Sequence, residues 1–223
     1  MNPELDFKKS LLKCLKSDIK EILSDTVEAS VDVLITNEVL KNIPFIEWGL
    51  KVTSTIDKIR TEFLIKKLRM FFVNTIDIDS KNYKNFVKGI TKKDLNELHS
   101  LILITIDRIN SEEKAALMGR IFSALVSNKI SRSIFFRLAN IIEALFIEDL
   151  KLFLEQKGAL SHDKRRSNFD ISQSYVTLGL YETHIVKSRN NTQKVDMDAN
   201  LEFCYMISML GQTFIEVCGN LKK

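Results

Sequence analysis

The chain has 223 residues, of which 45% are hydrophobic and 28% are charged. These proportions exclude a disordered chain, a collagen and a membrane-embedded protein. The 33 Lys and Arg residues against 29 Asp and Glu residues give a net charge of +4, which is smaller than expected for a dedicated nucleic-acid binder of this size. Seven Gly and two Pro leave few positions for tight hairpins, so the composition favours helices.

Cysteine usage and segment length point to a cytoplasmic protein. The three cysteines have no CxxC spacing, which argues against a disulfide framework and for a reducing compartment. The N-terminus lacks the apolar core and cleavage site of a secretory signal. The uncharged stretch Phe203–Ile215 is shorter than the ~20 residues that a transmembrane helix needs. The sequence therefore predicts no transmembrane segment.

The predicted N-terminal region, residues 1–36, contains one amphipathic helix. Leucines and isoleucines between Leu5 and Leu23 recur at helical spacing with lysines among them, so this helix is expected to dock on the main body. Pro44 disfavours helix at the residue before it and predicts a break. A long helix is then predicted from Leu50 to Val73. The residues of its expected apolar side are Val52, Ile56, Ile59, Phe63, Leu64, Leu68 and Phe71.

Residues 37–158 are predicted to form an antiparallel helical bundle. The polar segment Asp77–Gly89 is expected to be a connector with about one helical turn. Thr91, Ser111 and Ser131 each precede a helical pattern and are predicted N-caps. The helix after Thr91 is apolar nearly all round and is the predicted central helix, whereas the helix after Ser131 is expected to run on to Gly158.

Residues 159–223 form the third predicted region. The segment SHDKRRSN, 161–168, is polar and indicates a linker. Four elements are predicted after it: a short helix over Ser172–Leu178, strands over Leu180–Val186 and Leu201–Ile207, and a closing helix over Met209–Val217 that Gly219 stops. Asn190-Asn191 suits the hairpin turn. The predicted fold class is thus mainly α, an antiparallel helical bundle with a small C-terminal α+β unit that resembles a winged helix.

No pattern predicts a catalytic centre. The histidines, His99, His162 and His184, have no nucleophile or metal-ligand motif around them. The glycines are scattered singly, so no phosphate-binding loop of the GxGxxG or GxxxxGK[ST] kind is present. We therefore expect no enzymatic activity and no cofactor or metal.

Two basic features have both a structural and a binding interpretation. Lys51, Lys58 and Arg69 align on the predicted helix 50–73, interleaved with Glu62, and are expected on a solvated, internally paired face. The alternative is a surface for anionic lipid or nucleic-acid phosphate. The second feature is the run of Lys164, Arg165 and Arg166, which is predicted either to solubilise the linker or to contact phosphate.

An aromatic pair and the C-terminal unit complete the candidate interaction sites. Phe45 and Trp48 follow Pro44 in a broken segment, where aromatic side chains often anchor partners, although packing under a loop also explains them. If the C-terminal unit read DNA, the helix over Ser172–Leu178 would enter the groove with Gln173 and Ser174. That helix has no Arg or Lys, so protein packing or dimerisation is the favoured role.

Several segments resemble a bacterial protein family. They are IPFIEWGLKV (Ile43–Val52), IKKLRMFF (Ile65–Phe72), ITIDRINSEEKAALMGRIFSALV (Ile104–Val126), FFRLANIIEALFIEDLKLF (Phe135–Phe153), LGLYE (Leu178–Glu182) and YMISMLGQTFIEVC (Tyr205–Cys218). Their order is similar to that of abortive-infection alpha proteins, which are encoded in phage-defence or prophage neighbourhoods. Ser208 stands where such tails often have Thr. The resemblance implies a role in phage defence and brings no catalytic residues with it.

The combined expectation is a non-enzymatic interaction protein of the cytoplasm, in phage defence or the related immunity. Its expected partner is a protein, which includes a second copy of the chain. Two alternatives remain open: a DNA-binding regulator that uses the C-terminal unit, and a membrane-surface effector that uses Ile43–Phe72.

Overall fold

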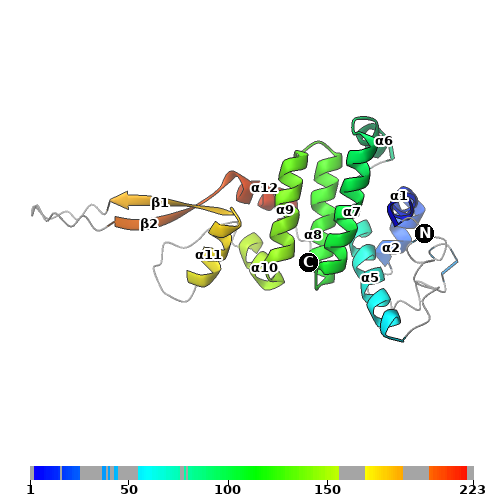
Figure 1. Ribbon diagram of the computed structural model, residues 1–223, viewed down its shortest axis with the longest axis horizontal. Coiled ribbons are helices and arrows are strands. Elements are labelled where there is room, and N and C mark those ends of the chain that lie inside the picture. Colours follow the sequence, from blue (N-terminus) through cyan, green and yellow to red (C-terminus); the bar gives the residue numbers. More distant parts are fainter. Residues whose placement is uncertain are drawn as a thin grey trace, which may run out of the picture. The chain divides into compact units, whose positions relative to one another are not determined.

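The structure is a computed structural model that describes residues 3–15, 17–25, 37–38, 40, 43–44, 55–75, 78, 80–155, 169–187 and 201–219. It is mainly α, with a two-stranded antiparallel sheet near the C-terminus, which confirms the predicted fold class (Figure 1). By compactness the chain divides into two units, Met1–Ile147 and Glu148–Lys223. The sequence prediction placed its boundaries after residues 36 and 158 instead.

The first unit is helical in its described residues. Its helices are α1 (Pro3–Cys14), α2 (Ser17–Asp25), α5 (Thr55–Val73), α6 (Ser80–Lys88), α7 (Lys92–Arg108), α8 (Glu112–Val126) and α9 (Arg132–Ala144). The prediction of a single helix between Leu5 and Leu23 was wrong, because α1 ends at Cys14. Ser17 and Asp18, residue types that favour helix N-termini, then begin α2.

The three predicted N-caps are confirmed. The side-chain oxygens of Thr91, Ser111 and Ser131 accept hydrogen bonds from backbone N–H groups three residues later, at 3.1, 3.1 and 3.3 Å. Each bond satisfies one of the N–H groups that a helix leaves without an internal partner. These caps fix the starts of α7, α8 and α9.

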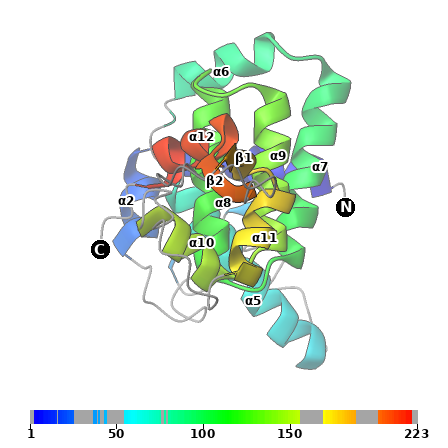
Figure 2. The same cartoon turned by 90° about the vertical axis from the view of Figure 1, so that its left-hand side faces the viewer.

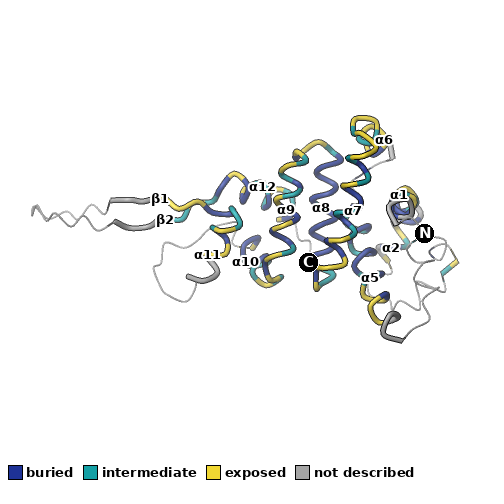
Figure 3. The backbone as a smooth tube through the Cα atoms, viewed as in Figure 1, coloured by how far each residue is buried: buried dark blue, intermediate teal, exposed yellow. Residues whose placement is uncertain are grey.

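The most buried helix of the bundle is α8, whereas the sequence predicted that it would be α7. Every residue from Lys114 to Val126 except Arg120 is buried, whereas Ile104 of α7 is 50% exposed (Figure 3). Small residues let the neighbouring helices approach α8 closely, and at Gly119 an added Cβ would overlap the Phe71 carbonyl oxygen of α5. The prediction of α7 as the central helix depended on apolar content alone. The small side chains of α8 favour α8 in that position, because they allow close packing.

The buried side of α5 also differs from the prediction. Ile65, Leu68, Phe71 and Phe72 are buried. Ile59 and Phe63, which were expected on the apolar side, are 57% and 60% exposed. The predicted apolar side is therefore confirmed for Leu68 and Phe71 and wrong for Ile59 and Phe63, whereas Val52 and the side chain of Ile56 lie outside the described residues.

Two further predictions within the bundle are corrected. The segment expected as a connector contains α6, a full helix that its buried Tyr83 anchors. The long helix expected from Ser131 to Gly158 is two helices, α9 and α10 (Ile147–Glu155), because Leu145 has extended backbone angles of φ −80° and ψ 152°. Phe146, in this break, is 70% exposed. Gly158 lies outside the described residues.

The second unit has the predicted order of elements. After α10 it contains α11 (Phe169–Thr177), β1 (Tyr181–Lys187), β2 (Leu201–Ile207) and α12 (Met209–Cys218). The strands pair antiparallel, from Tyr181 opposite Ile207 to Lys187 opposite Leu201. Gly219 caps α12, as predicted. The linker 161–168 and Asn190-Asn191 lie outside the described residues.

An aromatic cluster forms the core of the second unit. The ring of Phe153 lies 5.3 Å from Tyr175, 5.6 Å from Tyr181 and 6.1 Å from Phe214, measured between centroids. Ser208 joins the hairpin to α12, because its Oγ donates to the Gly179 carbonyl at 2.5 Å and accepts from the Gly211 N–H at 3.0 Å. The predicted elements therefore share one core within this unit.

Candidate functional site

The residues that the sequence singled out for partner binding all fall outside the described part of the chain. Phe45 and Trp48 follow Pro44, and Lys164, Arg165 and Arg166 follow α10. A binding role for these five residues therefore stays a prediction. Other side chains form the candidate site.

The prediction of a solvated basic face on the helix 50–73 is wrong for Arg69, whereas Lys51 and the side chain of Lys58 lie outside the described residues. The Arg69 side chain is 2% exposed and lies 3.5 Å from the Glu112 carboxylate, and burial lowers the pKa of its guanidinium. Lys67 is also buried, and its Nζ donates to the carbonyl oxygens of Asp107 and Ile109 at 2.8 and 3.0 Å. These cations hold the C-terminal end of α7 and the start of α8 within the bundle.

The described histidines have unlike environments. His99 is buried, with its Nε2 3.4 Å from the Tyr83 hydroxyl and its ring 5.2 Å from that of Phe7. His184 is exposed on β1, 3.8 Å from the Glu182 carboxylate. Within the described residues, no group of three or more His, Cys, Asp and Glu side chains is placed to hold a metal ion.

In the C-terminal unit, α11 has no Lys or Arg and so offers no basic surface. Gln173 and Ser174, the expected groove-facing residues, are both exposed on α11. Across residues 148–223 the chain has ten Lys and Arg and ten Asp and Glu. A unit with this balance has no net charge to attract a polyanion.

Lysines gather instead on one face of α6. Lys81, Lys84 and Lys88 are spaced three and four residues apart, which places them on the same side of the helix, and all three are exposed. Tyr83 is buried on the other side. No Asp or Glu occurs between Ser80 and Lys93, so α6 has a positively charged face and no acidic residue of its own.

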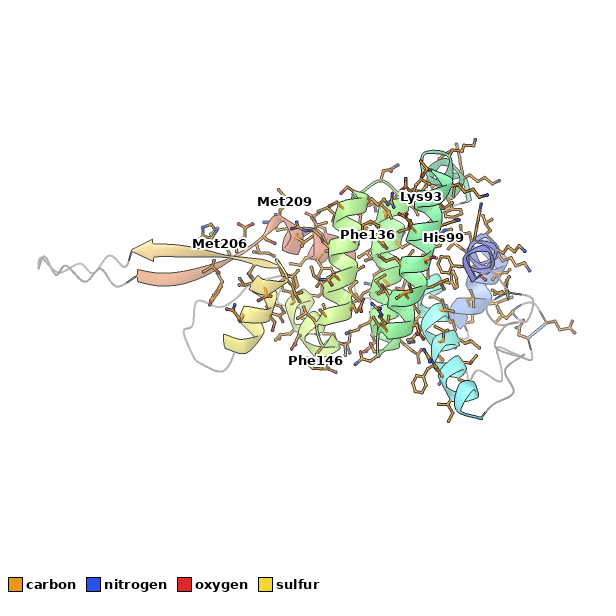
Figure 4. The ribbon with its side chains drawn as sticks, in the orientation of Figure 1. Lys93, His99, Phe136, Phe146, Met206 and Met209 are labelled. Atoms are coloured by element: carbon orange, nitrogen blue, oxygen red, sulfur yellow. The ribbon has the colours of Figure 1, made fainter. Side chains whose placement is uncertain are left out.

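The same end of the bundle holds further cations. Lys92 and Lys93 are exposed in the first turn of α7, and Lys129 is exposed in the turn from α8 to α9. Figures 1 and 2 show α6 at one end of the bundle, and Figure 1 shows the α8–α9 turn at this end too; Figure 4 labels Lys93 there. We name this group the basic end. It consists of Lys81, Lys84, Lys88, Lys92, Lys93, Lys129 and Arg132.

Among the described residues of the basic end, the carboxylates are those of Asp94 and Glu97, and both contact cations. Asp94 lies 3.0 Å from Arg132 Nη1 and accepts from the Thr91 hydroxyl at 2.7 Å. The hydrogen bond from Thr91, and then that from Arg132, lowers the pKa of the Asp94 carboxyl. Glu97 is 4.0 Å from Lys93 and 3.7 Å from Arg132. Asp94 and Glu97 thus offset Arg132 and Lys93.

The remaining lysines have no carboxylate to neutralise them among the described residues. Lys81, Lys84, Lys88, Lys92 and Lys129 form no ion pair with any residue that the structure describes. At this place the positive dipole ends at the N-termini of α7 and α9 are offset by the negative ends at the C-termini of α6 and α8, so the lysine side chains carry the positive charge. Lys92 and Lys93 stand in a first turn, where a cation is disfavoured by about 0.3–1 kcal/mol. The arrangement is suited to bind an anion.

No family model, curated protein sequence or solved structure matches this chain. The resemblance to abortive-infection alpha proteins therefore rests on the sequence segments alone. No helix in the described ranges combines the length and the apolar character that a bilayer crossing requires.

Sequence reasoning missed the basic end because it treated the segment before Gly89 as a connector. The spacing of Lys81, Lys84 and Lys88 at i, i+3 and i+7 is visible in the sequence, and so is the absence of acids from 80 to 93. This spacing has meaning only once the segment is a helix. The contribution of Lys129 depends on tertiary structure, which brings the α8–α9 turn to the same end.

Proposed function

We propose that this chain is a non-enzymatic binding protein whose interaction surface is the basic end. The observation that carries the proposal is the concentration of charge: among the residues that the structure describes, the basic end has seven cations against two carboxylates, a surplus of five, whereas the whole chain has a surplus of four. The rest of the chain is therefore close to neutral. Such a local excess attracts an anionic partner over about one Debye length, ~10 Å at 0.1 M salt.

The other ionisable groups have structural roles that are consistent with this proposal. Arg60 pairs with Asp107 at 2.9 Å, and Arg108 pairs with Glu143 at 3.5 Å. The buried Lys114 donates from its Nζ to the Glu143 carbonyl at 3.2 Å. These groups stabilise contacts between helices, whereas the lysines of the basic end face solvent.

The two alternatives have weaker support. A DNA-binding role for the C-terminal unit lacks a basic surface, because α11 has no Lys or Arg and residues 148–223 are balanced in charge. A membrane role for Ile43–Phe72 requires its apolar side to be exposed. Leu68 and Phe71 of that side are buried in the bundle, so only part of it, with Ile59 and Phe63 at 57% and 60% exposed, is open to lipid among the described residues.

The biological setting of the binding is proposed from the sequence resemblance. We propose that the protein acts in the bacterial cytoplasm in defence against phage, or in the corresponding immunity, as abortive-infection alpha proteins do. The anionic partner is then a phage or host component. The chain needs no bound cofactor for such a role.

A plaque assay tests the proposal. Bacteria that express the chain are expected to reduce phage plating, and K81Q/K84Q/K88Q is expected to restore it at equal protein level. K8Q/K9Q/K13Q, which removes the same charge from α1, is the matched control and should protect like the wild type. Equal protection by both variants would contradict a role for the basic end.

A further inference from the structure

We infer that the basic end binds the phosphate backbone of a nucleic-acid duplex without reading its sequence. The inference deepens the proposed function, on which it rests, by naming the anionic partner. The juxtaposition that carries it is the lysine face of α6 beside the N-terminal turn of α7 and the α8–α9 turn (Figure 4).

The spacing of the lysines fits a dense line of charge. Lys81 and Lys88 are seven residues apart on α6, which corresponds to about 10 Å along the helix axis at 1.5 Å per residue. A DNA duplex carries one negative charge per about 1.7 Å of its axis. The α6 face therefore spans about six phosphates. Lys92, Lys93 and Lys129 extend the positive surface past α6.

The side chains around the lysines favour a duplex over a single strand. Binding of single strands uses exposed aromatic rings on which unpaired bases stack. At the basic end Tyr83 is buried and Phe86 is half-buried. The Phe136 ring is occupied by Arg132, whose guanidinium carbon lies 5.5 Å from the ring centroid. No fully exposed aromatic ring is thus present among the described residues of this end.

The same side chains disfavour a lipid surface. A helix that lies on a membrane inserts large apolar side chains below its charged face. The large hydrophobic residues that are exposed in the described part of the first unit are Leu12, Ile59, Phe63, Ile104 and Phe146, and none of them belongs to α6, to the first turn of α7 or to the α8–α9 turn. The basic end therefore offers charge without an apolar anchor.

The chemistry of lysine also predicts the absence of sequence preference. Base-specific recognition commonly uses the bidentate guanidinium of Arg, whereas the ammonium of Lys is a point charge that suits phosphate oxygens. The arginine of the basic end, Arg132, is held by Asp94. Duplex DNA and duplex RNA of unrelated sequence should consequently bind with similar affinity.

The test is fluorescence anisotropy of a labelled 20-base-pair duplex, titrated with the full chain at several salt concentrations. Binding is expected to weaken as salt rises, with a log–log slope of about −4.5 if five lysines contact phosphates, because each contact contributes about −0.9. K81Q/K84Q/K88Q should reduce the slope by about 2.7 and weaken binding about tenfold or more at 100 mM salt. K8Q/K9Q/K13Q should retain the wild-type slope.

Four outcomes would overturn the inference. They are no binding of DNA or RNA duplex at 50 mM salt, equal losses in the two triple variants, binding of single strands in preference to duplexes, and binding of vesicles of phosphatidylserine and phosphatidylcholine without binding of duplex. Circular dichroism of each variant confirms that it is folded. If no duplex binds but phage protection still depends on the α6 lysines, the partner is another anion and the proposed function stands without this inference.

Discussion

The closeness of α5 and α8 leads to a specific prediction for Gly119→Ala. An alanine Cβ at this position would overlap the Phe71 carbonyl oxygen and would lie 2.9 Å from Asn74 Cβ. Because the clash is with the backbone of a helix, α5 must move as a body to relieve it. Such overpacking costs about 1–3 kcal/mol.

The cost is partly offset by helix propensity, because Ala is about 1 kcal/mol better than Gly within a helix. Separating the helices also weakens the contacts around the Phe71 and Phe122 rings, whose centroids are 5.6 Å apart. We therefore expect a net loss of about 2 kcal/mol in the free energy of unfolding. For a urea dependence of about 2 kcal/mol/M this lowers the midpoint by about 1 M.

The assay is urea unfolding followed by far-UV circular dichroism, with Gly89→Ala as the matched control. The nearest atoms to a Cβ at Gly89 are 3.6 and 3.7 Å away, which is ordinary contact, so this substitution should be neutral or stabilise by up to about 1 kcal/mol. If Gly119→Ala is as stable as Gly89→Ala, α5 and α8 are not as close as described, and the reasoning is refuted.

Three further predictions concern single buried side chains. Ser208→Ala removes the N-cap of α12 and the hydrogen bond to the Gly179 carbonyl, and should lower the free energy of unfolding by about 1–2 kcal/mol, as measured by thermal unfolding. Ser208→Thr, which keeps the hydroxyl, should retain that stability. Lys67→Met removes the donor of two backbone carbonyls at the end of α7 and should lower the free energy of unfolding, measured in urea, by about 1–3 kcal/mol. Lys66 is half-buried, and Lys66→Met should change this free energy little. Burial raises the pKa of the Tyr83 hydroxyl above its ordinary 10.0, so the unfolded chain loses this proton first and the free energy of unfolding should fall as pH rises beyond about 10. Tyr83→Phe should reduce that fall. An unchanged dependence of stability on pH would contradict the burial of Tyr83.

Much of the fold could be predicted from the sequence because local chemistry marks it. Thr91, Ser111 and Ser131 precede apolar periods and cap the helices as expected. The strand over Leu201–Ile207 and the helix that ends at Gly219 were likewise predicted. Caps and periodicity depend on neighbours within one turn, so they need no knowledge of tertiary contacts.

The errors arose where tertiary packing overrides local pattern. Burial of Arg69 depends on Glu112 and on the approach of α8, neither of which the sequence of α5 reveals. The break at Leu145 has no Gly or Pro to mark it. The basic end was not predicted for the same reason, because Lys129 lies in a turn that is distant in sequence from α6 and comes to the same end only in the folded bundle.

Lysine footprinting by mass spectrometry tests whether a duplex binds at the basic end, because it reports which amino groups a bound partner covers. The intact protein is acetylated briefly with and without a saturating 20-base-pair duplex at 50 mM salt. We expect protection of Lys81, Lys84 and Lys88, with unchanged labelling of Lys8 and Lys9. Protection confined to Lys164 or to the N-terminal lysines, with α6 labelled as in the free protein, would contradict this expectation.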